Sequence, residues 1–353
     1  MYLPMKQFLC CCLFAGFIVF NAKAQPTESN NLKILESKEI WPGESHSAFT
    51  DLERFQDKWY CAFRIGKGHA GKGDYGRIRV IVSDDGQSWR SSALIQTDGV
   101  DLRDAKLSVT PSGELLLNSC EYRVDNDRED IRNNTSVVYR SKNGTDWSKA
   151  KQIADKGYWL WQTSWLGETG YSLGYQWGNS DATRFYRTTD GEKYELLVDH
   201  IRPPGDRSNE HAMFFDLKGS AHMLLRRDNA RSKTGGYALL GKAEPPYTDW
   251  EWRRLNITLG GPSMLQLPDG RVIACVRRYA DENHRNWGSQ WTELGWIDTQ
   301  NAIYKPVAKL PSGGDSSYAG LVFYDGLLWV SYYSSHEGST SIYLAKIRVE
   351  ELK

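Results

Sequence analysis

The chain has 353 residues, a formal net charge of zero, 12% aromatic residues, 14 Trp and 32 Gly. This length allows a large hydrophobic core, and a composition rich in Trp, Tyr and Gly is typical of all-β proteins with many turns. The balanced charge provides no field for nucleic acid or for an anionic membrane surface, which argues against both as partners.

The first 24 residues have the pattern of an export signal. Lys6 precedes an apolar run at 8–20, and Ala22-Lys23-Ala24 follows it. An apolar run of this length is too short to span a bilayer, and the A-x-A pattern is a cleavage signal. We therefore expect cleavage after Ala24. The mature protein would be secreted or periplasmic, monomeric and not inserted in a membrane, with residues 25–353 as a single domain.

The six cysteines do not form a disulfide pattern. Cys10, Cys11 and Cys12 lie in the export segment, and the remaining three, Cys61, Cys120 and Cys275, each lie in an apolar strand-like run. An odd number in such runs favours buried free thiols. No Cys/His cluster has the spacing of metal ligands, so the sequence predicts neither a metal nor a cofactor.

A turn motif recurs along the chain. It reads SDDGQSW at 83–89, SKNGTDW at 141–147 and, in weaker form, TTDGEKY at 188–194. Each copy follows an alternating run, and Asp-Gly or Asn-Gly after such a run is a strong hairpin signal. Gly supplies the positive φ of the turn, and the Asp or Asn side chain caps backbone N–H groups. Copies at a spacing of about 50 residues indicate a repeat architecture.

In phase with these turns, a unit of three strands can be traced six times. Its third strands end near Ser83, Ser141, Thr188, Lys242, Asp298 and Lys346. A fourth, outer strand follows five of the units but not the sixth, and a strand-like run at 32–41 precedes the first. We therefore predict an all-β fold, a six-bladed β-propeller in which the N-terminal strand completes the last blade.

The positions that converge on one face of such a propeller are unusually polar. These are the starts of the first strands and the ends of the second strands, and they carry Arg64, His46, Arg103, Asp104, Glu210, His211, Arg226, Arg277 and Tyr318. Charged groups that converge in one funnel cost desolvation free energy unless a ligand or partners compensate. The pattern therefore predicts a site for a polar ligand.

The repeated S-x-[DN]-G-x-x-W turns, the six units and these polar residues resemble the sialidase superfamily (Asp-box, BNR-repeat) over essentially the whole mature chain. The resemblance implies an exo-α-sialidase-like glycoside hydrolase that removes terminal acidic sugars, such as sialic acid, from glycans. It also implies a retaining mechanism with a Tyr nucleophile, a Glu that activates it, an Asp acid/base and three Arg that bind the substrate carboxylate. Because sialic acid carries a carboxylate on its anomeric carbon, it repels a carboxylate nucleophile but not a neutral Tyr. The planar fork of Arg suits bidentate binding of that carboxylate.

On this resemblance the catalytic roles fall to three residues. Tyr318 corresponds to the nucleophile, and Glu210 corresponds to the Glu that activates it. Asp74, in a glycine-rich loop, corresponds to the acid/base, with Asp104, Asp125 or Asp127 as alternatives.

The carboxylate-binding arginines match less completely. Arg226 resembles the second of the three, with Arg227 as the alternative, and Arg285 resembles the third, with Arg277 as its rival. The family's first Arg is missing, because Ser45-His46-Ser47-Ala48 stands at the start of the first unit, and we expect Arg103 to replace it.

The missing Arg leaves two other functions open. One is a different glycosidase, or a lyase with His46 or His211 as its base, acting on a uronate-bearing polysaccharide. The other is a propeller that binds glycans without turnover. Nucleotide binding is not expected, because the loop at 66–73 fits no phosphate-binding pattern and opens no helix.

Overall fold

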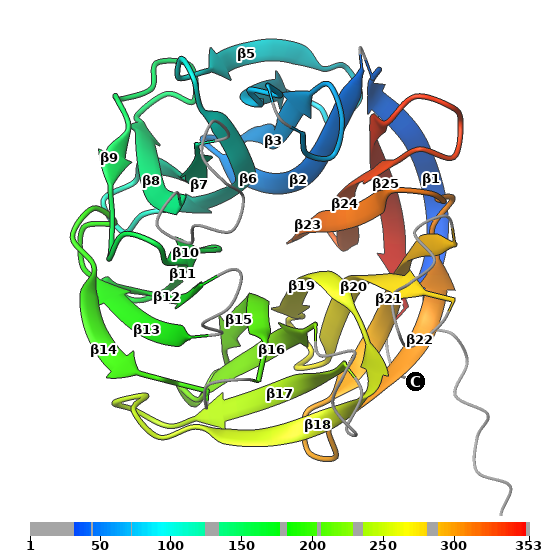
Figure 1. The fold of residues 1–353 in the computed structure, drawn as a ribbon. Helices are drawn as coiled ribbons and strands as arrows, with labels where there is room; N and C mark the ends of the chain where they lie inside the picture. The colour runs from blue at the N-terminus through cyan, green and yellow to red at the C-terminus, as the bar shows by residue number, and fades with distance from the viewer. Residues whose placement is uncertain are drawn as a thin grey trace, which may run out of the picture. The chain divides into compact units, whose positions relative to one another are not determined.

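A computed structural model describes residues 32–43, 45–71, 73–123, 134–176, 182–202, 206–228, 236–280 and 289–350, within one compact unit at 31–353. These described residues form strands and no helix, and their strands make six antiparallel sheets arranged as blades around a central axis (Figure 1). None of them forms a helix long and apolar enough to cross a membrane. The predicted six-bladed propeller is confirmed.

Successive strands of the chain build the blades. Blade one is β2 (His46–Phe55), β3 (Lys58–Gly66), β4 (Arg77–Ser83) and β5 (Arg90–Ile95), and blade two is β6 (Asp101–Val109), β7 (Leu115–Tyr122), β8 (Asn134–Ser141) and β9 (Lys151–Gln152). Blade four is β15 (Ser208–Phe215), β16 (Ala221–Arg227), β17 (Tyr237–Ala243) and β18 (Glu251–Thr258). Blade five is β19 (Gly260–Gln266), β20 (Val272–Tyr279), β21 (Gln290–Asp298) and β22 (Ile303–Lys309).

Blade three differs from the predicted pattern. We expected one first strand at 161–167, but the chain forms two short pieces, β10 (Trp159–Leu160) and β11 (Ser164–Leu166). Both pieces pair with β12 (Thr169–Tyr175), and β13 (Thr183–Thr188) and β14 (Glu195–Asp199) complete the sheet. Between the pieces Trp161 is fully buried, and the Thr163 hydroxyl lies 2.6 Å from that of Tyr194. Residues 161–163 therefore interrupt the first strand of this blade.

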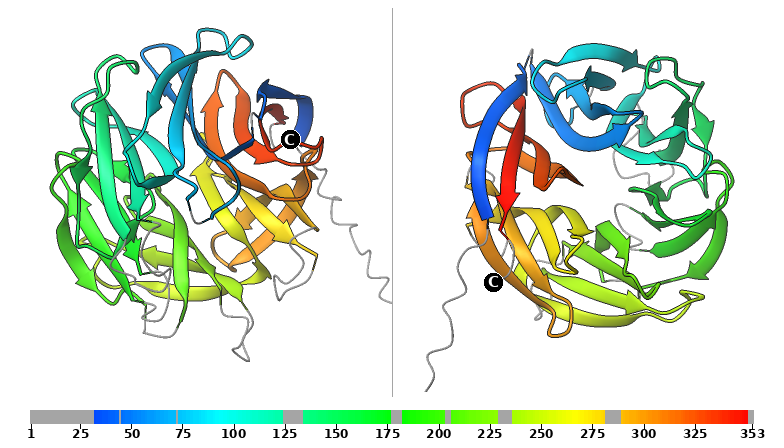
Figure 2. Two further views of the ribbon diagram at one scale, coloured as in Figure 1. Left: turned by 45° about the horizontal axis from the view of Figure 1, so that its top comes forward. Right: turned by 180° about the vertical axis from the view of Figure 1, so that it is seen from behind.

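The ring closes in blade six through the N-terminal strand. Blade six combines β23 (Ser316–Tyr324), β24 (Leu327–Ser334) and β25 (Ser341–Val349) with β1 (Leu32–Trp41). β1 pairs antiparallel with β25, and Leu32 lies opposite Val349. Figure 2 shows the blue β1 beside the red β25 at the outer edge of the ring. This pairing joins the two ends of the described chain in one sheet, as predicted.

The recurring turns have the expected chemistry. In the first copy the Gly86 N–H donates to the Ser83 hydroxyl at 2.8 Å, and Asp85 Oδ1 accepts the N–H groups of Gln87 and Ser88 at 2.7 and 3.0 Å. The same bonds recur around Asn143 and Asp190. The glycines of the three turns have φ of 69°, 72° and 72°. Each turn therefore satisfies its own backbone donors.

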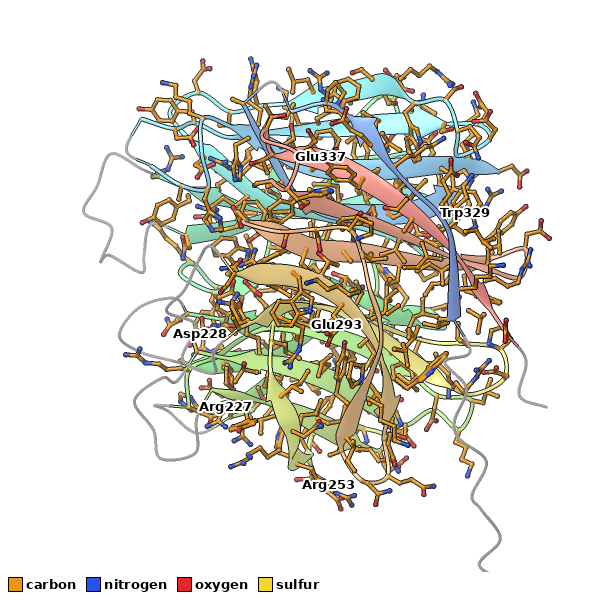
Figure 3. The ribbon with its side chains drawn as sticks, turned by 90° about the vertical axis from the view of Figure 1, so that its right-hand side faces the viewer. Arg227, Asp228, Arg253, Glu293, Trp329 and Glu337 are labelled. Carbon is orange, nitrogen blue, oxygen red and sulfur yellow. The ribbon has the colours of Figure 1, made fainter. Side chains whose placement is uncertain are left out.

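Aromatic packing ties the first turn to the neighbouring blade. The ring centroids of Trp59 and Trp329 are 4.2 Å apart, and a Cβ on Gly86 would lie 2.5 Å from the Trp329 ring. Seen edge-on, Trp329 and Asp228 lie toward opposite faces of the ring of blades (Figure 3). The thiols of Cys61, Cys120 and Cys275 are buried and free, as expected.

Replacing Gly144 by Ala should destabilise the fold more than replacing Gly113. Both residues have positive φ, but a Cβ on Gly144 would meet the Tyr60 ring at 2.2 Å, whereas one on Gly113 meets nothing within 4 Å. We expect Gly144→Ala to lower the free energy of unfolding by about 1–3 kcal/mol more than Gly113→Ala, because only the first substitution adds an overpacking cost. Urea unfolding of both variants measures the difference, and equal values would contradict it.

Candidate active site at the propeller hub

A bulge that recurs in the first strands aims side chains at the hub. In blades one, two, four, five and six, two residues of the first strand oppose one residue of the second at the same place in the ladder. Four of these bulges begin at a residue with φ between 49° and 59°, namely Phe49, Asp104, Gly261 and Tyr318. A bulge bends its strand and redirects side chains. Here it brings Phe49, Asp104, Glu210 and Tyr318 to one cavity.

The cavity has a volume of about 350 Å³. Its charged lining consists of Asp101, Arg103, Asp104, Glu210, Arg226, Asp228 and Arg277. Aromatic side chains complete much of the wall, namely Phe49, Tyr122, Trp159, Tyr175 and Tyr318. A concave site in which charged groups converge beside aromatic side chains suits a small polar ligand. A second depression of about 500 Å³ lies beside β16, β17 and β18, away from this set of charges.

Tyr318, Glu210 and Arg226 form a hydrogen-bonded triangle. The Tyr318 hydroxyl donates to Glu210 Oε1 at 2.6 Å. Arg226 Nη1 donates to the same Glu210 oxygen at 2.7 Å and to the Tyr318 oxygen at 3.0 Å. The structure thus brings these three residues, each singled out from the sequence, within hydrogen-bonding distance of one another. Asp228, which the sequence analysis did not single out, accepts from Arg226 Nε at 2.9 Å and fixes its orientation.

Gly261 holds the pair from the neighbouring blade. Its N–H donates to the second oxygen of Glu210 at 2.8 Å. A Cβ at this position would lie 2.5 Å from the Tyr318 ring, so a side chain larger than that of glycine would clash with the ring. Burial, and then the charge of Glu210, raise the pKa of the Tyr318 hydroxyl well above its ordinary value, against the lowering effect of Arg226 and Arg277.

Arg277 and Arg103 lie on either side of this pair. The Arg277 guanidinium carbon is 4.6 Å from the centroid of the Tyr318 ring, and its Nε donates to the Ser316 carbonyl at 2.8 Å. Arg103 Nη2 donates to the His69 carbonyl at 3.1 Å. Nη2 of Arg226 and Nη1 of Arg277 make no hydrogen bond to any described residue, although both residues line the cavity. Arg285, the first choice for the third arginine, lies outside the described residues, as do Asp125 and Asp127.

Asp74 and Arg64 lie behind the cavity wall. Arg64 is fully buried, and its Nε donates to Asp101 at 2.7 Å while Nη2 lies 3.1 Å from Asp74. Burial alone would raise the pKa of Asp74, but the backbone N–H groups of Lys67 and Gly68 and the charge of Arg64 lower it below its ordinary value. A carboxylate held ionised and away from the cavity is a poor general acid. The expected role of Asp74 does not fit this placement.

Asp104 has the properties that Asp74 lacks. It lines the cavity, is 5% exposed, and its carboxyl accepts no hydrogen bond from a described residue. Burial first, and then the charge of Glu210, raise its pKa to about 7, against the lowering effect of Arg103. A carboxyl group that is partly protonated near neutral pH is suited to donate a proton.

The two histidines singled out from the sequence do not line the cavity. His211 is fully buried, its Nε2 lies 3.5 Å from the Leu173 nitrogen, and burial followed by the charge of Lys106 lowers its pKa to about 3. His46 Nε2 lies 3.0 Å from Asp315 Oδ2. The histidine that does reach the cavity is His69, which the sequence analysis did not predict because it lies in a loop without strand periodicity.

No family model matches the chain, and no curated protein matches it. Several solved structures match the chain. A protein of unknown function from Dyadobacter fermentans aligns at 14% identity over 91% of this chain and 100% of its own, with a TM-score of 0.74. An α-L-arabinanase from Penicillium chrysogenum aligns at 13% identity over 91% of this chain and 100% of its own, with a TM-score of 0.68.

A sialidase is also among the similar structures. The Trypanosoma rangeli sialidase, solved with 2,3-difluorosialic acid as a covalent intermediate, aligns at 12% identity over 89% of this chain, with a TM-score of 0.65. The present chain spans 59% of the length of that protein. At such identities these likenesses establish the propeller fold.

Replacing Asp104 by Asn should change how stability depends on pH. Asp104 has a pKa of about 7 in the folded chain and about 4 in the unfolded chain, so between these values the folded state binds the extra proton. The free energy of unfolding of the wild type should therefore fall relative to that of Asp104→Asn as pH rises from about 5 to 8, by on the order of a few kcal/mol.

Urea unfolding at several pH values measures this difference. Asp85→Asn is the control, because the pKa of Asp85 lies at about 2 and its removal adds no slope in this range. A constant difference between wild type and Asp104→Asn from pH 5 to 8 would show that Asp104 titrates normally.

Proposed function

We propose that the chain is a retaining glycoside hydrolase of the sialidase type, in which Tyr318 is the nucleophile and Glu210 its base. The observation that carries the proposal is the 2.6 Å hydrogen bond from the Tyr318 hydroxyl to Glu210. Arg226 Nη1 donates both to that Glu210 oxygen and to the Tyr318 oxygen. A nucleophile within hydrogen-bond reach of a base that a third group orients is the arrangement that covalent catalysis requires.

The first chemical step uses both carboxyl groups. As the Tyr318 oxygen bonds to the anomeric carbon, its proton passes to Glu210, and Asp104 protonates the departing glycosidic oxygen. In the second step Asp104, now ionised, removes a proton from water, and that water displaces Tyr318, which regains its proton from Glu210. General acid catalysis of this kind contributes about 10²–10⁴ in rate.

The substrate proposed is a terminal sugar with a carboxylate beside the reacting carbon. Arg226 and Arg277 each have one nitrogen without a hydrogen bond to the described part of the chain, and these donors favour such a group. Two guanidinium groups can bind an anion, and a neutral tyrosine beside them is not repelled by it. Arg103 is the third cation of the cavity. A sialidase among the structures of similar fold supports this choice.

A second candidate is a glycosidase for a neutral sugar. It is favoured by the ion pairs that the cavity arginines already make with Asp101, Asp228 and Asp315. The arabinanase of similar fold agrees with it. The lyase alternative is weaker, because His46 and His211 do not line the cavity.

For the chain as a whole we propose export as a monomer after removal of the 24-residue leader. Its substrate would be a glycan outside the cytoplasm. No cofactor is needed for the hydrolysis described above.

Tyr318→Phe should abolish turnover and covalent labelling. The variant keeps the ring, and Glu210 still accepts from Arg226 and Gly261, so the fold should survive. We expect a loss of at least about a thousandfold in kcat/KM for release of sialic acid from an α-linked sialoside. With 2,3-difluorosialic acid, mass spectrometry should find an adduct on the wild-type peptide that contains Tyr318 and none on the variant.

Tyr332→Phe is the matched control, because its hydroxyl contacts Ser37 and the Pro311 carbonyl rather than the cavity. Full activity in Tyr318→Phe would exclude the mechanism. Turnover of arabinosides but not of sialosides by the wild type would select the second candidate, and glycan binding without any turnover would exclude both.

Asp104 should determine the pH above which kcat/KM falls. Since the acid must be protonated in the first step, kcat/KM should fall as pH rises through about 7. Asp104→Asn should lose this pH dependence and most of kcat/KM on natural glycosides, but much less of kcat/KM on an aryl glycoside whose leaving group needs no protonation, because kcat/KM reports the first step. Equal losses of kcat/KM on both substrates would assign Asp104 a structural role.

A further inference from the structure

Three residues that are far apart in the sequence converge beside the cavity. His46 begins β2, His69 lies in the loop after β3, and Asp315 precedes β23. Asp315 Oδ2 lies 3.0 Å from His46 Nε2 and 2.7 Å from His69 Nδ1. Among the described residues, these three potential ligand atoms all lie within 4.8 Å of one another.

The donor set suits a divalent transition metal. Two imidazole nitrogens and one carboxylate oxygen, with a remaining position for water or substrate, are the ligands of many zinc sites. Ligands about 2.0–2.1 Å from a tetrahedral ion lie about 3.3 Å apart. The two separations from Asp315, 3.0 and 2.7 Å, are shorter than this value, so the imidazoles would have to move away from the carboxylate by a few tenths of an ångström to admit an ion between the three groups.

Asp315 is held in place by its other oxygen. Oδ1 accepts the Tyr333 hydroxyl at 2.7 Å and lies 3.3 Å from Arg277 Nη2. In metal sites, hydrogen bonds to the second oxygen of a ligand carboxylate fix its orientation toward the ion. Oδ2 is therefore the oxygen that remains for an ion.

The cluster is accessible from the cavity. His69 lines it, and its side chain is 38% exposed. The cavity receives arginines from blades two, four and five, while Arg64 of blade one is fully buried in ion pairs. An ion at this cluster would supply positive charge on the side of the cavity formed by blade one.

We propose that His46 Nε2, His69 Nδ1 and Asp315 Oδ2 bind one divalent transition-metal ion, with Zn²⁺ as the representative, and leave one coordination position open toward the cavity. Use of that position by an anionic sugar rests on the proposed function. Binding of the ion itself does not rest on the proposed function, and it is tested without substrate.

The test is a calorimetric titration of the full chain, first stripped with a chelator, with Zn²⁺ in a non-chelating buffer. We expect one ion per chain. His69→Gln should weaken binding at least tenfold, since it removes a ligand at an accessible position, and His46→Gln should do the same. Zn²⁺ should raise the melting temperature of the wild type but not of His69→Gln, because an ion that binds only the folded chain stabilises it.

His222→Gln is the matched control. His222 Nε2 lies 3.0 Å from Asp216 Oδ2, as His46 lies from Asp315, but no third ligand joins that pair among the described residues. This variant should bind Zn²⁺ like the wild type. Circular dichroism checks that all variants are folded.

The proposal is overturned if the wild type binds no Zn²⁺, if His69→Gln binds it equally well, or if His222→Gln loses binding to the same extent. In each of these cases the cluster is a hydrogen-bonded pair of imidazoles on one carboxylate. Tyr318→Phe should bind Zn²⁺ like the wild type, so a failure of the proposed hydrolase and a failure of the metal site are seen separately.

Discussion

The hub of this propeller depends on the contact between Gly261 and the Tyr318–Glu210 pair. The Gly261 N–H binds one oxygen of Glu210, and its missing Cβ leaves the space that the Tyr318 ring occupies. Glu210 comes from blade four, Gly261 from blade five and Tyr318 from blade six, so three blades must keep their spacing for the pair to form. The pairing of β1 with β25 closes the ring within blade six, so the ring cannot open there without breaking that ladder.

The charges at the hub are placed at a cost that the rest of the fold must offset. Burying a charge is unfavourable unless it is paired and hydrogen-bonded. Arg64 and Arg277 are almost fully buried, and each contacts at least one carboxylate. Asp104 has no such partner among the described residues, and its raised pKa is the result. A buried carboxyl group without such a partner is costly to ionise, so Asp104 is suited to exchange a proton near neutral pH.

Much of this arrangement could be predicted from the sequence, because turns and strand alternation are local. The Asp-Gly turns set the phase of the blades, and the phase placed Tyr318, Glu210 and Arg226 at converging positions. The different placements of Asp74 and Asp104 could not be predicted, since they depend on a bulge in β6 and on the contact between Arg64 and Asp74. The proximity of His46 to Asp315 could not be predicted either, because 269 residues separate them along the chain.

Arg277 contacts both Tyr318 and Asp315, the carboxylate that lies against His46 and His69. Its guanidinium stacks on the Tyr318 ring, while its Nη2 contacts Asp315 and Tyr333. In the proposed mechanism Glu210 takes the phenol proton and so loses the charge that opposes ionisation, and Arg226 and Arg277 then stabilise the phenolate. A substrate carboxylate bound to the same arginines would weaken that stabilisation if it displaced their present contacts. Because Arg226 and Arg277 each have one nitrogen that makes no hydrogen bond to a described residue, an anion could bind there while the contacts to Tyr318 persist. In the proposed mechanism the same two cations therefore serve both substrate binding and activation of the nucleophile.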